Sequence, residues 1–451
     1  MAQWNKNTQD YLNQERTLHE VFMCADRYGN IGNCGVSTGI GGGGYDAFGR
    51  ARVSETFTLA DYSHQYGPDP EFIVKTVGTG STISANTNEA SVGLIVGVGS
   101  TSRVVYQSRM YHHYMPGKSQ FALASFKFGA SRTNTVKRVG YFDDRNGVFL
   151  QQAGDGTVSI VRRSYSSGIA SDTVVNQSSW ALDTLDGNGS TGISLDFSKT
   201  QLLAVDYQWL GVGRVRCGLV IGGSLVYFHE FNHANVQEKV YWSHASLPIR
   251  TEIANTDTAV GVSSMQDICA TVLSEGGYTE TGYQNTGITT AIAFPSATNP
   301  GYRKCVMALR TKDTFKGYPN RTSVRLTDIQ VLSDATNCAI EIWRLPGSES
   351  ITSGSWVSAG DDSGVEYNIS TGENFTTTNG SKKSISLIAA NNPSGQQASN
   401  TVNFDPTTTK SAYIAQNIDA DNSNVWAVIV ENLDGNTTTD VTSAMTWRET
   451  R

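Results

Sequence analysis

Short apolar runs separated by turn-forming residues dominate the chain from Tyr45 onward. Between the runs stand clusters such as DDRNG (143–147) and DGNGSTG (186–192), in which Gly, Asp and Asn favour turns. No helical segments alternate with these runs, so the pattern predicts antiparallel sheets rather than a parallel α/β fold. The predicted strands of the first part are Val92–Val98, Phe121–Phe128, Gly147–Leu150, Val158–Val161, Leu202–Val205, Val215–Ile221 and Leu225–Phe231.

The segment AFPSATNPGY (293–302) predicts a domain boundary, because it combines prolines with polar residues. Beyond it, apolar runs recur among long Ser/Thr/Asn/Gly tracts. We therefore expect a mainly β protein, with a jelly-roll or concanavalin-like antiparallel β-sandwich over residues 45–295 and a second, smaller β-sandwich over residues 300–451. The expected core residues of the first domain include Trp180, Trp209 and Trp242.

The first residues differ from the rest. Apolar side chains recur there at helical spacing until DRYGN (26–30) breaks the pattern, which predicts a short N-terminal helix within residues 1–34. This helix either covers the first domain or anchors the chain on a partner or a sister chain. A glycine-rich linker is predicted over residues 35–44, and its G-x-G-x-x-G spacing follows no strand, so no dinucleotide site is expected. The candidate assembly anchor comprises Trp4, Tyr11, Leu12, Leu18 and Phe22.

The segment 206–235 holds the longest apolar and aromatic run and contains HEFNH, which matches the zinc-protease pattern H-E-x-x-H. That pattern binds zinc on a helix, where residues four apart share one face. The flanking residues instead predict a strand, a type I′ turn at Gly-Gly and a second strand. On such a strand His229 and His233 lie about 13 Å apart and Glu230 faces the other way. Glu252 stands where another class of zinc protease has a glutamate, so a zinc hydrolase stays open as the weakest hypothesis.

The same hairpin makes a sharper structural prediction. Its first strand should place arginines on one face and apolar residues on the other, because side chains alternate along a strand. The residues concerned are Arg214 and Arg216 on one face, and Val215, Cys217 and Leu219 on the other.

Other titratable residues are weaker candidates. In YHHYMPGK (111–118), the adjacent histidines would face opposite sides of a core or interface strand. Two aspartate pairs, 143–144 and 183–186, resemble the carboxylates of glycoside hydrolases, but each stands in a turn sequence that favours Asp. DGNG (186–189) and DADNSN (419–424) lack the spacing of an EF-hand, which leaves a structural calcium ion as a minor alternative. We therefore expect no catalytic, metal or cofactor residues.

Composition excludes some partners. The net charge of −7 and the pI of about 5.6 argue against binding to nucleic acid. Six cysteines lack C-x-x-C spacing, so free thiols are expected, and only Cys24 and Cys34 are close enough for a local disulfide. The first residues carry charges, so we expect no signal peptide, and there is no long apolar run, so we expect no membrane insertion. Both features predict a protein made in the cytosol.

Several long strings together resemble one group of proteins. These are MAQWNKNTQDYLNQERTLHEV, DAFGRARVSETFTLADY, YHHYMPGKSQ, RVGYFDDRNGVFL, QWLGVGRVRCGL, HEFNHAN and LPIRTEI. They resemble virion structural proteins of bacteriophages, especially marine and cyanobacterial phages. The resemblance covers roughly residues 1 to 280, and it implies presence in the virion without implying an activity.

We therefore expect a non-enzymatic phage structural protein, assembled into virions in the host cytoplasm. The resemblance favours a surface appendage (a tail fibre, a baseplate or collar component, or a head decoration) that contacts other virion proteins. By analogy with phage fibres, we expect a homo-oligomer, with a trimer preferred. The alternative is a glycan-binding module for host adsorption, using exposed aromatic residues and polar loops such as those near Trp356 and Tyr367.

Overall fold

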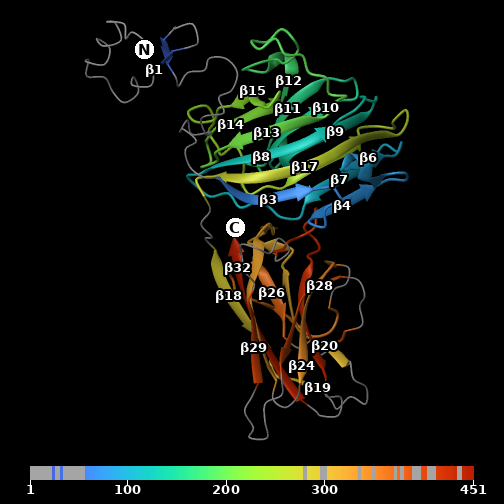
Figure 1. Ribbon diagram of the computed structural model, residues 1–451, viewed down its shortest axis with the longest axis vertical. Coiled ribbons are helices and arrows are strands. Elements are labelled where there is room, and N and C mark those ends of the chain that lie inside the picture. The colour runs from blue at the N-terminus through green and yellow to red at the C-terminus, as the bar shows by residue number, and fades with distance from the viewer. Residues whose placement is uncertain are drawn as a thin grey trace, which may run out of the picture.

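The structure is a computed structural model. It describes residues 56–277, 282–294, 302–333, 337–347, 351–369, 373–375, 380–388, 398–403, 413–433 and 439–450, together with two short strands nearer the start. These strands, β1 (Met23–Ala25) and β2 (Ile31–Asn33), pair antiparallel (Figure 1), so the predicted N-terminal helix does not extend into them. The candidate anchor residues Trp4, Tyr11, Leu12, Leu18 and Phe22, and the linker predicted over 35–44, lie outside the described residues.

The first sandwich consists of a seven-stranded and an eight-stranded antiparallel sheet. The seven-stranded sheet runs β12 (Ser171–Asn176), β11 (Val158–Ser164), β10 (Gly147–Gln152), β9 (Thr135–Phe142), β16 (Ile249–Asn255), β7 (Arg103–Ser108) and β4 (Phe72–Val77). The eight-stranded sheet runs β15 (Ser224–Phe231), β14 (Val215–Ile221), β13 (Gln201–Tyr207), β8 (Ser119–Lys127), β17 (Ser263–Glu275), β6 (Ser91–Val96) and β5 (Thr82–Asn86), and β3 (Phe57–Ser63) also pairs with β17. Two short 3₁₀ turns are η3 (Thr87–Glu89) and η4 (Gln177–Ser179).

Alternation of side chains builds the core between these two sheets. In β16, Ile249 and Ile253 are buried in the core, whereas Arg250 and Glu252 point to the outer face. Trp180 and Trp242 are buried as expected, and Trp209 packs half-buried against the same core. The predicted mainly β sandwich is therefore confirmed.

The second sandwich begins earlier than the prolines predict. β18 (Tyr283–Ile288) and β19 (Ile292–Phe294) both pair with β32 (Thr439–Thr450), so residues assigned to the first domain by the predicted boundary belong to the second sandwich. Its six-stranded sheet adds β23 (Ser323–Ser333), β29 (Ala398–Asn403) and β30 (Tyr413–Ile414). Its seven-stranded sheet contains β25 (Trp356–Ser358), β26 (Val365–Asn368), β20 (Tyr302–Thr311), β31 (Val425–Asn432), β24 (Cys338–Leu345), β28 (Ser381–Ile388) and β27 (Glu373–Asn374); β21 (Thr314–Phe315) and β22 (Tyr318–Pro319) form a separate hairpin.

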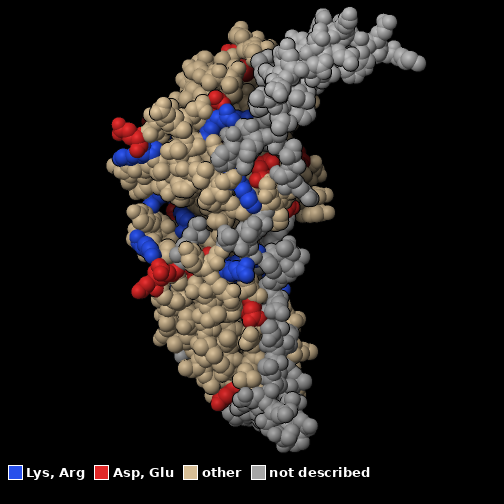
Figure 2. All heavy atoms as spheres, turned by 90° about the vertical axis from the view of Figure 1, so that its left-hand side faces the viewer, with Lys and Arg blue, Asp and Glu red and all other residues tan. Residues whose placement is uncertain are grey.

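The two sandwiches meet beside β4, the edge strand of the first seven-stranded sheet (Figure 1). Arg344 donates to both oxygens of Glu71 at 2.7 and 2.9 Å, and Lys75 pairs with Asp419. The guanidinium of Arg321 lies 4.8 Å from the ring centroid of Tyr111, and a small pocket beside them is lined by Tyr111 and residues 320–323 and 415–416. On the face drawn in Figure 2, Lys and Arg side chains gather at the level of this contact. We call this contact region the seam.

Candidate functional site

HEFNH lies on a strand, as the flanking residues predict. In β15, His229 pairs with Cys217, whose side chain lies in the core, whereas Glu230 pairs with Arg216 of the outer face. His229 accepts a hydrogen bond from the backbone N–H of Ala181 at 3.1 Å. The side chains of His229 and Glu230 therefore lie on opposite sides of the strand, and the helical zinc geometry is excluded.

The hairpin that contains this strand also has the predicted form. Gly222 and Gly223 both have positive φ, as a type I′ turn requires. Val215, Cys217 and Leu219 lie in the core, whereas the guanidinium of Arg216 donates to Asp206 at 2.6 Å and that of Arg214 to Glu230 at 3.4 Å. The prediction of alternate faces is confirmed.

The YHHYMPGK segment is not the strand that was predicted. Only His112 makes a bridge, to Leu247, because Pro116 and Gly117 soon end the extended run. His112 is fully buried between Tyr62 and the Leu247 carbonyl, and burial lowers its pKa to about 4. It is a neutral core histidine.

The aspartates of the turns act as backbone acceptors. Asp143 accepts from the backbone N–H groups of Arg145 and Asn146, and Asp183 accepts from those of two residues in its own loop. In DADNSN, Asp419 pairs with Lys75 and Asp421 accepts from Asn417. Across the described ranges, no group of three or more His, Cys, Asp or Glu side chains could hold a metal ion.

The aromatic residues expected near a glycan site, Trp356 and Tyr367, both contact other side chains of the second sandwich. The Arg310 guanidinium lies 4.0 Å from the ring centroid of Trp356, and Tyr367 packs against the core of the second sandwich. Trp356 pairs with Asn368, and Tyr367 pairs with Val357, so the two aromatic side chains lie on opposite faces of their sheet and do not form one platform.

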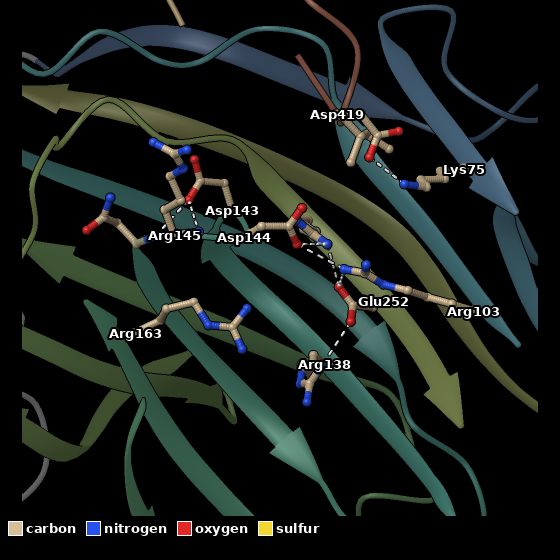
Figure 3. Close-up of polar contacts among 12 residues, drawn as sticks. Lys75, Arg103, Arg138, Asp143, Asp144, Arg145, Arg163, Glu252 and Asp419 are labelled. Atoms are coloured by element: carbon tan, nitrogen blue, oxygen red, sulfur yellow. Dashed lines mark hydrogen bonds and ion pairs between the residues drawn. The ribbon is translucent and has the colours of Figure 1, made fainter. Parts of the chain in front are cut away.

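The outer face of the first seven-stranded sheet carries an arginine–carboxylate cluster that the sequence did not single out. We call it the arginine network and define it as Arg103, Arg138, Asp144, Arg250 and Glu252. Register brings these residues together, because Glu252 of β16 lies opposite Arg138 of β9. Figure 3 shows the side chains of Arg103, Arg138, Asp144 and Glu252 converging above the sheet, with Lys75 and Asp419 of the seam at one side.

Glu252 is the centre of the arginine network and is buried. Its Oε1 accepts from Arg138 at 2.8 Å, and its Oε2 accepts from Arg103 at 3.0 Å and from Arg250 at 2.6 Å. Asp144 accepts from Arg103 at 2.9 Å and from Arg250 at 2.8 Å. Burial alone would raise the pKa of Glu252, but the three guanidinium groups hold it well below its usual range.

Asp144 is also held as an anion. Burial would raise its pKa, but the guanidinium groups of Arg250 and Arg103 lower it.

The half of this face away from the seam offers a fixed polar surface. Arg163 makes a two-pronged pair with Asp172 at 2.8 and 2.9 Å, and Gln151 accepts from Arg138 at 2.8 Å. The guanidinium groups of Arg138 and Arg163 lie 5.7 and 5.1 Å from the ring centroid of buried Phe149. The arginine side chains keep 19% and 13% of their surface exposed, so they remain accessible to a ligand.

A sequence signal for the arginine network does exist. In LPIRTEI, Arg250 and Glu252 stand two positions apart in a strand flanked by Ile249 and Ile253, so they share the face opposite to the two isoleucines. Two partners of Glu252 come from other strands: Arg103 from β7 and Arg138 from β9. Each of them is more than a hundred residues away from Glu252 in the sequence. Strand spacing reveals the pair, but only the sheet order reveals the network.

No protein-family profile and no curated protein matches the sequence. Among solved structures, a Bacillus licheniformis β-glucanase is 10% identical and covers 49% of this chain and 98% of its own, with a TM-score of 0.30. A Bacteroides ovatus family 16 endo-glucanase is 11% identical over 48% of this chain and 99% of its own (TM-score 0.33), and a legume lectin-like domain of Entamoeba histolytica is 8% identical over 49% and 98% (TM-score 0.28). The strand pairing of this chain itself shows an antiparallel β-sandwich over about half its length, with further sheets after it.

Proposed function

We propose that this chain is a non-catalytic structural protein of a bacteriophage particle, carried on its surface as an appendage component. The observation that supports this best is the seam, where one guanidinium nitrogen of Arg344 donates to both carboxylate oxygens of Glu71 and so joins the two sandwiches. These side chains are only 9% and 16% exposed, so the pair is well shielded from solvent. A joined pair of sandwiches suits a part that projects from a particle and carries load.

The carboxylates of the arginine network support the same proposal. They are held as anions by arginines, an arrangement that favours rigidity over proton transfer. The phage context rests on the sequence strings of residues 1 to 280. Assembly through the N-terminal residues, as a homo-oligomer with a trimer preferred, remains part of this proposal.

Immunogold electron microscopy of intact particles tests the location. An antibody raised against the second sandwich should label the outside of whole particles, and labelling should be regular in position. An antibody against residues 1–34 provides the comparison, because an anchor should react only after particles are dissociated. Labelling by the first antibody only after particles are opened would contradict the appendage role.

Glycan binding is the second candidate function. The polar surface on the outer face of the first seven-stranded sheet, in the half away from the seam, favours it. Planar groups of Arg138, Gln151 and Arg163 are fixed there by their ion pairs and hydrogen bonds, so a sugar would meet a preorganised surface. A glycan array should show binding that Arg163→Gln reduces at least about tenfold. The control is Lys199→Gln, a change at an exposed residue elsewhere; equal binding by both variants would remove this candidate.

A further inference from the structure

Basic side chains converge on one carboxylate at the seam. Glu71 receives both hydrogen bonds of Arg344 from the second sandwich. The backbone N–H of Arg109, just after β7, donates to the Glu71 carbonyl at 2.7 Å, so Arg109 is its neighbour within the first sandwich. Arg109 also lies close enough to Arg344 for the two positive charges to repel each other.

Lys383 reaches the same place through a β-bulge. In the pairing of β24 with β28, Trp343 faces Lys382 and Ile342 faces Ser384, which leaves Lys383 as the extra residue. A bulge turns a side chain away from the regular alternation of its strand. Ser381, two positions before Lys383, pairs directly with Arg344, so Lys383 lies near the Arg344 end of β24, and the charges of Arg344, Glu71 and Arg109 act on it.

Two of these cations lack a counter-ion. Glu71 is already engaged by Arg344, and within the described residues the side chains of Arg109 and Lys383 make no hydrogen bond or ion pair. The Nε of Arg109 is moreover buried without a partner. Buried Nε atoms of Arg103 and Arg250 in the arginine network also lack a partner, so what distinguishes Arg109 is that its guanidinium makes no ion pair with a carboxylate among the described residues.

We propose that Arg109, Lys383 and Arg344 form a binding site for an oxyanion at the seam between the two sandwiches. The ligand class is a sulfate, phosphate or carboxylate group carried on a larger molecule. Arginine presents planar pairs of N–H donors to such groups, and lysine adds a compact positive charge. The site does not rest on the phage role, since it would bind an anion in any assembly to which the chain belongs.

The electrostatics of the free site agree with this geometry. Burial lowers the pKa of Lys383, and the positive charge of Arg344 lowers it further. Burial and then Arg344 likewise lower the pKa of Arg109. A bound anion would relieve this repulsion, and because the whole chain has a net charge of −7, the attraction is local to the seam.

Titration with inorganic sulfate tests the site. Calorimetry at constant ionic strength, with chloride as the reference salt, should show sulfate binding to the full chain. Arg109→Gln and Lys383→Gln should each weaken that binding at least about tenfold. The matched control is Lys316→Gln, because Lys316 is exposed and already paired with Asp362, and this variant should bind like the wild type.

Competition then identifies the source of the anion. If a sulfated oligosaccharide displaces sulfate more effectively than glycerol phosphate does, the ligand is an acidic glycan. If glycerol phosphate displaces sulfate more effectively, the ligand is a lipid headgroup. Thermal unfolding of each variant verifies that it is folded. Sulfate binding no tighter than chloride binding, or binding unchanged in both Arg109→Gln and Lys383→Gln, would overturn the proposal, and neither result bears on the immunogold test.

Discussion

Two groups of arginines meet carboxylates on the same sheet but differ in their balance of charge. In the arginine network, three guanidinium groups share the carboxylates of Glu252 and Asp144, and each carboxylate bridges at least two of them. At the seam, Glu71 faces Arg344, Arg109 and Lys383, and only Arg344 is paired with it. The difference indicates that pairing decides the role: a cluster in which every cation is paired with a carboxylate stabilises the fold, whereas one with two unpaired cations can still bind an external anion.

The largest effect should come from removing the centre of the compensated cluster. Glu252→Gln leaves Arg250, which is fully buried, with a weaker counter-charge. Breaking such a buried pair should lower the free energy of unfolding of the first sandwich by about 3–5 kcal/mol, measured by urea denaturation. The control Glu230→Gln affects a partly exposed pair with Arg214 and should cost less than about 1 kcal/mol. Equal losses in the two variants would mean that the network is not a stabilising centre.

Acid should break the same cluster. The pKa of Glu252 is lowered in the folded state, so its stabilisation is fully present above the unfolded pKa of about 4.3 and is lost as pH falls toward the folded pKa. Between about pH 5 and pH 2 the wild type should lose stability more steeply than Glu252→Gln, because the variant has no carboxyl group to titrate there. Parallel curves from urea denaturation at several pH values would contradict this assignment.

Removing the carboxylate of the seam should give a smaller loss with a different response to salt. Glu71→Gln leaves Arg344 without its paired carboxylate, and it should cost about 1–3 kcal/mol in the unfolding of the full chain. Sulfate should then stabilise this variant more than it stabilises the wild type, because the site has become more positive. Equal stabilisation of both proteins at constant ionic strength would mean that sulfate acts on the surface in general.

The smallest effect should come from Tyr111→Phe at the seam pocket. The Tyr111 hydroxyl is buried, and it has no hydrogen-bond partner among the described residues. Removing it should leave the free energy of unfolding unchanged or raise it by up to about 1 kcal/mol. A loss of stability instead would contradict the conclusion that this hydroxyl is unpartnered among the described residues. Thermal unfolding of the two proteins in one buffer measures the difference.

Local patterns were sufficient to predict much of the fold. Alternation along Val215–Ile221 and the Gly222-Gly223 turn predicted the hairpin that the structure contains, because both features depend only on neighbouring residues. The domain boundary was less accessible. Two prolines pointed to residues 293–302, but β18 and β19 find their partner in β32, which follows about 150 residues later in the chain.

The sequence by itself determined the class of the fold, the strand on which His229 and Glu230 lie, and the faces of that strand. These properties follow from alternation and turn chemistry, which act over a few residues. Tertiary structure alone decided which charges meet. Arg344 reaches Glu71 across 273 positions and Arg138 reaches Glu252 across 114, because sheet order and the docking of two sandwiches bring distant strands together. Electrostatic energy depends on distance in space and on burial. The paired cations of the network and the unpaired Arg109 and Lys383 of the seam could therefore be told apart only in the folded chain.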